Sequence, residues 1–137
     1  TIAMCRFYSL FKRIFMSGYL TTHILDTARG CPAVGLEIEL YSIEGKLRRQ
    51  LCSAMTNADG RTDEPMLAED EFAFGVYELV FHAGHYFRKL GLDCDELAQD
   101  APLFLDAIPI RFGLSLPRHY HVPLLLSPFG YSTYRGS

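Results

Sequence analysis

Short runs in which apolar residues alternate with polar ones are the feature that most restricts how this chain can fold. The clearest is LEIELY at residues 36–41, where Leu36, Ile38 and Leu40 alternate with two glutamates and a tyrosine. Successive side chains of a β-strand point to opposite faces, so this period of two predicts a strand with one buried face. Such strands bury their apolar faces most simply when one sheet packs on another.

Other runs have the composition of strands and lie at residues 20–25, 47–56, 75–82, 108–112 and 120–126, with a last candidate at 132–135. Glycine-containing turns separate several of them, at IEGK (43–46) and NADG (57–60). Only residues 86–92 have helical character, with an extension over 94–99 as an alternative. The pattern therefore predicts an all-β fold: a two-sheet antiparallel β-sandwich with one short helix.

Length and charge exclude several classes of protein. The 137 residues indicate one domain, and an apolar content of 49% is enough for one core. No run of about 18 apolar residues is present, which argues against a membrane-spanning helix. The net charge of −3, without a basic stripe, gives no electrostatic footprint for nucleic acid.

The cysteines bear on the compartment. They are scattered, form no Cys-x-x-Cys pair, and are interpreted as reduced thiols, with disulfides as the alternative. A cytoplasmic location is expected, and a peroxisomal or periplasmic one stays open. The four residues are Cys5, Cys31, Cys52 and Cys94.

Residues 1–15 differ in composition from the rest of the chain. Three basic residues interrupt their apolar positions, so they contain no signal-peptide core of about 7–15 apolar residues. An amphipathic surface helix is one interpretation. We favour the other, a non-native or disordered extension before a start at Met16, and expect residues 16–137 to form the folded domain.

Three histidines on candidate strands are open to a chemical role. Alternation places His23 on the same strand face as Thr21, and it places His119 and His121 on one face of a later strand. Two imidazoles at this spacing can bind one metal ion, but no cysteine or third histidine lies nearby in the sequence. A purely structural pair, and a half-buried or surface His23, are the alternatives.

Arg61 directly follows the tight turn at 57–60, which aims an arginine better than a mobile loop does. Its planar guanidinium suits carboxylate-like or imide oxygens, although a solvated loop arginine is the alternative. His82 and His85 are interpreted as surface residues that flank a turn. The common nucleophile, phosphate-loop, dinucleotide and zinc-protease motifs are absent from the sequence.

Four motifs in the same order are similar to those of one enzyme family: LTTHILD (20–26), TNADGR (56–61), IPIRFGL (108–114) and HYHVPLLLSPFGYSTYRGS (119–137). Through them the chain, from about residue 17 to its end, resembles the 5-hydroxyisourate hydrolases, the transthyretin-related enzymes of purine degradation. The terminal YRGS is highly specific, because hormone-carrying transthyretins lack it. Two departures are the segment 87–107, longer than the family minimum, and the fifteen N-terminal residues.

The resemblance implies a fold, an assembly and a reaction. The fold is transthyretin-like, with two four-stranded sheets face to face and a short helix after the fifth strand. The assembly is a homotetramer, a dimer of dimers, with active sites in the channel between dimers. The reaction is hydrolysis of 5-hydroxyisourate to 2-oxo-4-hydroxy-4-carboxy-5-ureidoimidazoline in urate degradation, with an activated water and neither cofactor nor metal.

The resemblance also implies site residues. The catalytic group is His23, Arg61 and His121, whereas His119 belongs to the same motif without an assigned role. Substrate binding would use His23, Arg61 and the terminal tetrapeptide, which closes the site. The tetrapeptide is Tyr134, Arg135, Gly136 and Ser137.

These residue types suit the reaction. A histidine, with an ordinary pKa of about 6.5, can take a proton from water near neutral pH. A cation beside His23 favours the neutral imidazole that a base needs. Arg61 can stabilise charge that builds on a carbonyl oxygen. Which histidine is the base stays open.

Two other classes of protein remain as alternatives. A non-catalytic carrier of a small ligand could use the same fold, but two histidines and an arginine are costly groups to desolvate in a passive channel. A metal-binding module built on His119 and His121 lacks further ligands in the sequence.

Overall fold

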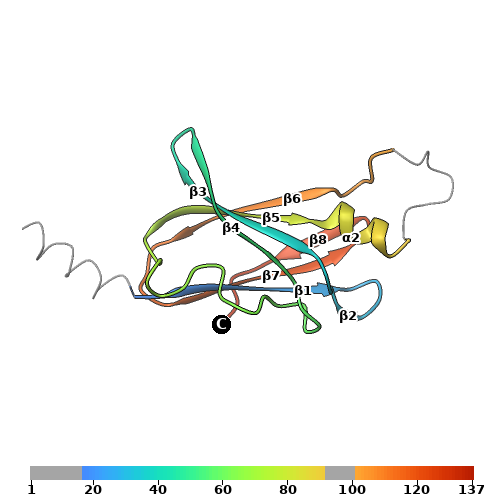
Figure 1. Cartoon of the computed structure of the whole chain (residues 1–137), viewed down its shortest axis with the longest axis horizontal. Coiled ribbons are helices and arrows are strands. Elements are labelled where there is room, and N and C mark those ends of the chain that lie inside the picture. Colours follow the sequence, from blue (N-terminus) through green and yellow to red (C-terminus); the bar gives the residue numbers. More distant parts are fainter. Residues whose placement is uncertain (1–16, 92–100) are drawn as a thin grey trace, which may run out of the picture.

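The computed structural model describes residues 17–91 and 101–137, which form two four-stranded sheets packed face to face (Figure 1). The expectations for residues 1–15, for a start at Met16 and for a helical extension over 94–99 lie outside the described residues. The first sheet, in the order β2-β1-β7-β8, consists of Cys31–Pro32, Tyr19–Asp26, His119–Ser127 and Gly130–Thr133. The second, in the order β4-β3-β5-β6, consists of Leu47–Met55, Glu37–Glu44, Gly75–His82 and Ala107–Leu114.

Alternation along the strands places the core between the sheets. The even-numbered residues of β1 are at most 1% exposed, and those of β7 are buried as well. The odd-numbered residues, which include Thr21, His23, His119 and His121, lie on the other face and are half-buried, except for the buried Pro123. The prediction that His119 and His121 share a face is therefore confirmed, and it is the outer face of the first sheet.

The sandwich is antiparallel as predicted, apart from one pair of strands. β1 and β7 run parallel, with Tyr19 level with His119 and Thr21 level with His121. Parallel neighbours need a long connection, and here the whole second sheet lies between them in the sequence. This pairing makes residues about a hundred positions apart in the sequence direct neighbours on adjacent strands.

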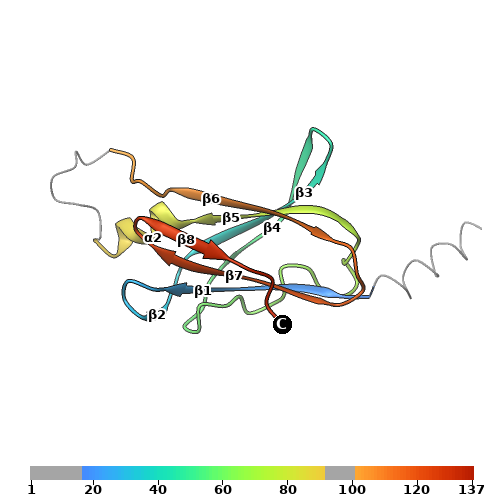
Figure 2. The same ribbon diagram turned by 180° about the vertical axis from the view of Figure 1, so that it is seen from behind.

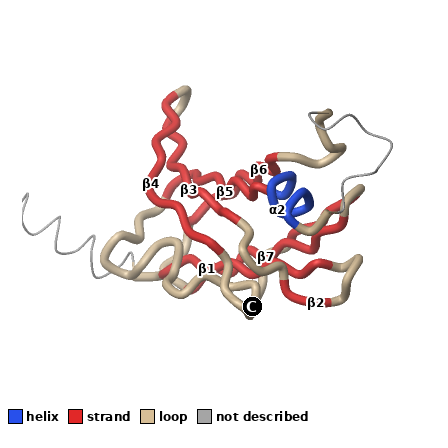
Figure 3. The backbone as a smooth tube through the Cα atoms, turned by 45° about the vertical axis from the view of Figure 1, so that its right-hand side comes forward, coloured by secondary structure: helices blue, strands red, loops and turns tan. Residues whose placement is uncertain are grey.

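The short helix α2, Ala83–Lys89, follows β5 directly and lies at one end of the sandwich (Figure 3). The sequence predicted this helix at residues 86–92, and the observed helix begins and ends three residues earlier. The helix begins early because the Gly84 amide donates a hydrogen bond of 3.1 Å to the Asp106 carbonyl, an approach that leaves no room for a side chain. It ends at Lys89, and Gly91, with a φ of +67°, closes the last turn by donating a hydrogen bond of 3.0 Å from its amide to the Arg88 carbonyl.

Two histidines are placed differently from the prediction. His82 precedes the first residue of α2 and His85 lies within the helix, so neither flanks a turn. His85 is exposed as expected, but His82 is half-buried and its Nε2 contacts a carboxylate oxygen of Glu39.

Two smaller differences concern strands. The last strand occupies 130–133 rather than 132–135, and the two-residue β2 was not predicted, because so short a segment shows no alternation. Cys31 and Cys52 are free thiols. Within the described ranges, no helix has the length and apolar character needed to cross a membrane.

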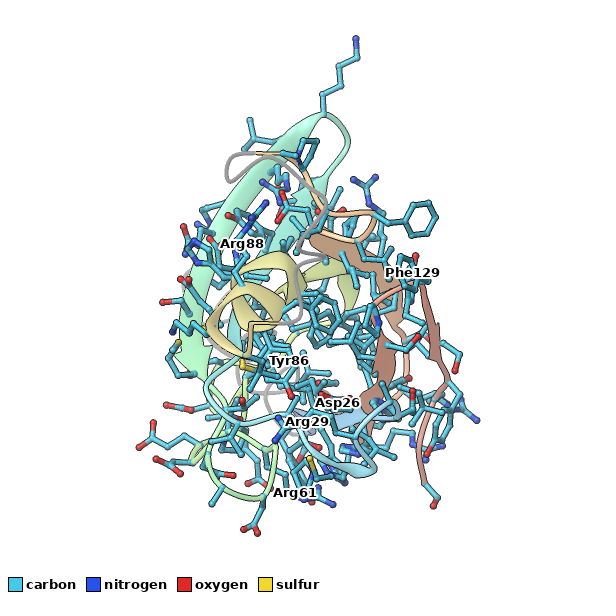
Figure 4. The ribbon with its side chains drawn as sticks, turned by 90° about the vertical axis from the view of Figure 1, so that its right-hand side faces the viewer. Asp26, Arg29, Arg61, Tyr86, Arg88 and Phe129 are labelled. Atoms are coloured by element: carbon cyan, nitrogen blue, oxygen red, sulfur yellow. The ribbon has the colours of Figure 1, made fainter. Side chains whose placement is uncertain are left out.

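A buried carboxylate fixes the end of β1. Asp26 is fully buried and accepts hydrogen bonds from the Tyr86 hydroxyl at 2.7 Å and the Arg29 amide at 3.0 Å (Figure 4). Burial, and then the neighbouring Asp26, raise the pKa of Tyr86 to about 12. The helix and the first strand are therefore tied together at neutral pH.

Candidate functional site

The candidate site begins with a threonine between two histidines on the outer face of the first sheet. Thr21 Oγ1 lies 2.6 Å from His119 Nε2 and 2.8 Å from His121 Nδ1. The His119 ring stacks on Tyr19, with 4.0 Å between ring centroids and 5° between planes. Sequence reasoning did not single out Thr21 or Tyr19, because only the parallel pairing of β1 with β7 makes them neighbours of the histidines.

The turn at residues 57–60 has a backbone that suits a tight reversal. The Asn57 side chain accepts hydrogen bonds from the amides of Asp59 at 2.9 Å and Arg61 at 3.2 Å. Gly60 has a φ of +72°, a conformation that side-chain-bearing residues rarely adopt. The turn therefore holds the backbone of Arg61 in place.

The same turn is attached to β1. The Gly60 carbonyl accepts a hydrogen bond of 2.9 Å from the Ile24 amide, and His23 and Arg61 form an antiparallel bridge. A Cβ at Gly60 would lie 2.5 Å from the Ile24 carbonyl oxygen, so only glycine permits this approach. In Figure 4, Arg61 lies at the side of the molecule away from Arg88 of α2.

The C-terminal tail lies on the other side of His121. The Gly136 amide donates a hydrogen bond of 2.7 Å to the His121 carbonyl, and the two residues form an antiparallel bridge. This bridge continues the register of β7 with β8, in which Leu124 pairs with Thr133. Figure 2 shows the tail leaving β8 and running past β7 toward β1.

Exposure differs along the tail. Gly136 is buried, whereas the other three residues of the tetrapeptide are exposed, Tyr134 at 58%. The main chain at Gly136 thus contacts the site, and the side chains of Tyr134, Arg135 and Ser137 are free to meet a ligand or another chain.

The electrostatics favour neutral imidazoles. Burial, followed by the charge of Arg61, lowers the pKa of His23. Burial lowers the pKa of His121 as well, followed by Arg61 and the two other histidines. The pKa of His119 is lowered by burial and then by Arg118. Both histidines expected to be catalytic therefore lie within the field of Arg61 and are neutral near pH 7.

The structure brings four of the predicted site residues together: His23, Arg61, His121 and Gly136. For the metal alternative, the part of the chain that the structure describes provides no third ligand beside His119 and His121. Among residues 17–91 and 101–137, the one group of three potential metal ligands is in the other sheet and comprises Glu37, Glu39 and His82.

Known proteins resemble this chain over most of its length. A model of the HIUase/Transthyretin family matches residues 20–136. "5-Hydroxyisourate hydrolase 2" of Rhizobium meliloti is 56% identical over 122 residues, which are 88% of this chain and 98% of that protein. "5-Hydroxyisourate hydrolase" of Mesorhizobium japonicum is 58% identical over 120 residues, 88% of this chain and 93% of the other.

Solved structures also resemble this chain. Klebsiella pneumoniae 5-hydroxyisourate hydrolase matches with a TM-score of 0.69 at 33% identity, covering 87% of this chain and 99% of that one. Sea bream transthyretin in complex with thyroxine has a TM-score of 0.72 at 27% identity, covering 85% and 93%. An (S)-allantoin synthase has a TM-score of 0.77 at 42% identity; 90% of this chain spans 45% of that longer one. The chain therefore belongs to the HIUase/Transthyretin family.

Proposed function

We propose that this protein is an enzyme that hydrolyses 5-hydroxyisourate to 2-oxo-4-hydroxy-4-carboxy-5-ureidoimidazoline, a step of urate degradation. The observation that carries the proposal is the convergence of His23, Arg61 and His121 on one sheet face, next to the buried Gly136 of the tail. The high identity to curated 5-hydroxyisourate hydrolases supports the same substrate.

Each residue has a task in this reaction. One of the two neutral histidines takes a proton from the attacking water, help that is worth roughly 10²–10⁴-fold in rate. Arg61, always charged and able to donate two hydrogen bonds at once, stabilises the oxygen on which charge develops. Arg61 also disfavours protonation of both histidines, so the cation that binds the substrate helps to keep the base ready.

The tail completes the binding site in this proposal. Gly136 holds the chain end beside His121, and the exposed Tyr134, Arg135 and Ser137 provide hydrogen-bond donors for the substrate. The reaction needs only water and these side chains, so no cofactor or metal is invoked.

We also propose a homotetrameric assembly, a dimer of dimers, with the site in the channel between dimers. β8 is one end strand of the first sheet and β6 is one end strand of the second, and exposed edge strands are ready to pair with another chain. Phe104, shortly before β6, and Phe129, in the turn before β8, lie close together, with 6.3 Å between ring centroids. Both side chains are largely exposed, at 74% and 79%. Residues 16–137 would be the assembling domain, in the cytoplasm.

The function is tested by the absorbance decay of freshly generated 5-hydroxyisourate. The protein should accelerate the decay, and Arg61→Ala should lose at least a hundredfold in rate. Arg49→Ala is a matched control, because Arg49 is exposed on β4 in the other sheet. Binding of the substrate without acceleration would instead identify a carrier, and would overturn the proposal.

A further inference from the structure

We propose that Thr21 and His119 form a proton relay behind His121, in which the Thr21 hydroxyl sets the proton position on His121 and passes a proton to His119. The proposal rests on the hydrolase function and makes Thr21 and His119 positioning residues of that reaction. It is carried by the two short contacts of Thr21 Oγ1, 2.6 Å to His119 Nε2 and 2.8 Å to His121 Nδ1.

The hydroxyl couples the two rings. A threonine has one proton to donate, so between two ring nitrogens it donates to one and accepts from the other. When Thr21 donates to His119 Nε2, it accepts from a protonated His121 Nδ1, and His121 Nε2 is bare. In the reverse arrangement His121 Nε2 carries the proton. Only the first arrangement makes His121 a base, so the state of His119 decides whether His121 can act.

The relay balances as a proton transfer. His121 Nε2 takes a proton from the attacking water, which makes His121 an imidazolium. Its Nδ1 proton then moves to Thr21 Oγ1, while the hydroxyl proton of Thr21 moves to His119 Nε2. His121 is neutral again with a proton on Nε2, and the positive charge lies on His119. Reversal returns a proton through Thr21 as His121 Nε2–H protonates the departing ring nitrogen.

The surroundings give this transfer a direction. Burial, and then the charge of Arg61, lower the pKa of His121 and disfavour a positive charge there, so the relay moves the charge away from the substrate-binding arginine. His119 receives it against the face of Tyr19, at 4.0 Å between centroids, where a cation is attracted to the ring. Burial, and then Arg118, lower the pKa of His119, which favours return of the proton.

Removal of the hydroxyl tests the relay. Thr21→Val keeps the shape of the side chain and should lower kcat by about 10–100-fold with KM little changed, a share of what acid–base help contributes. Thr21→Ser restores the hydroxyl and should recover most of the rate. Thr22→Val is the matched control, since it removes a neighbouring hydroxyl that points to the buried face and donates to the Val122 carbonyl at 2.8 Å, without a histidine partner.

Nitrogen NMR of the substrate-free protein gives a readout besides activity. In Thr21→Val the imidazole signals of His119 and His121 should both change, in tautomer and in titration midpoint, while His23 is unaffected. His119→Gln provides a second route if Thr21→Val fails to fold. It should lower kcat by a similar factor and shift the tautomer of His121.

The outcomes separate the relay from the function. An active wild type with an equally active Thr21→Val and an unchanged pH profile would overturn the relay and leave the hydrolase function in place. A Thr21→Ser variant as slow as Thr21→Val would also overturn it, because the hydroxyl would not be the agent. A wild-type protein without hydrolysis would refute the function, and independent titration of His119 and His121 would then refute the coupling too.

Discussion

His121 and Gly136 are joined by a backbone hydrogen bond of 2.7 Å from the Gly136 amide to the His121 carbonyl. A Cβ on Gly136 would lie 2.7 Å from Cδ2 of the His121 ring, closer than side chains tolerate. The contact continues the pairing of β7 with β8 beyond the exposed Tyr134 and Arg135. The chain end therefore contacts His121, the proposed base, in two ways: it is hydrogen-bonded to the His121 backbone, and it lies so close to the ring that only a glycine fits.

A chain that ends at Thr133 should remain folded and lose at least a hundredfold in hydrolysis rate. Tyr134 is 58% exposed, so its removal forfeits less than the roughly 1.5–3 kcal/mol of a fully buried side chain. Loss of positioned donors is more serious, at about 10²–10³ in rate for one donor. Size-exclusion chromatography and the absorbance assay measure the two effects. An unfolded or monomeric truncation would make the tail structural, and full activity would remove it from the chemistry.

Gly136→Ala should lower kcat by about tenfold or more while the fold persists. The added methyl collides with the His121 ring, and small displacements of a catalytic group have large effects on rate. Gly113→Ala on β6 is the control, because open space surrounds that position and its φ lies outside the region that favours glycine. Equal rates for the two variants would show that the tail does not position His121.

Much of this arrangement could be predicted from residue patterns. Alternation put His23 on the face of Thr21, and His119 and His121 on one face of a later strand, because a period of two determines which residues of a strand share a side. That these are outer faces became known only from the burial of the other side. The catalytic trio and the tail came from motif resemblance. Thr21 escaped notice, since its partners depend on which strands pair and in which direction, information that no local pattern contains.

The helix boundaries failed for a related reason. Gly84 is a poor helix former, and its place in α2 is set by a contact with Asp106, more than twenty residues later. Tertiary contacts also hold Arg61 against His23, through the hydrogen bond from Ile24 to Gly60. Sequence could predict a turn before Arg61, but the strand on which that turn docks became known only with the fold.

Arg61→Gln should move the acid limb of the pH–rate profile to higher pH, in addition to lowering the rate. The charge of Arg61 lowers the pKa of both His23 and His121, so its removal raises both values. A higher pKa means that the neutral base disappears at a higher pH as the solution is acidified. The profile of kcat/KM measures the shift, with Arg49→Gln as control. An acid limb that does not shift in Arg61→Gln would show that the charge of Arg61 does not affect the pKa of the base.

Dialysis against a strong chelator should leave the hydrolysis rate unchanged. Thr21 occupies Nε2 of His119 and Nδ1 of His121, the nitrogens through which this pair would otherwise share an ion. The three-ligand group of Glu37, Glu39 and His82 belongs to the opposite sheet. The assay is repeated after addition of zinc to the dialysed protein. A rate that collapses on dialysis and returns with zinc would contradict the proposed mechanism.

Stability should fall as the pH decreases through the range in which histidines titrate. The pKa values of His23, His119 and His121 lie below their ordinary 6.5 in the folded protein, so the unfolded chain binds more protons below that pH. The contribution of these histidines to the free energy of unfolding is therefore fully present above about pH 6.5. It declines as the pH falls toward the pKa values of the folded protein. The lowered pKa of Glu39 acts only in a more acidic range, below its ordinary 4.5.

Denaturant unfolding at pH 7.5 and pH 5.5, at one protein concentration, measures this decline. His119→Gln should reduce the difference between the two pH values, because it removes one of the groups that the fold keeps neutral. His85→Gln, at an exposed position of α2, serves as the comparison with an equal change of side chain. If both variants show the same pH dependence as the wild type, folding does not keep His119 neutral. The electrostatic argument for His119 as the temporary proton acceptor of the relay would then be wrong.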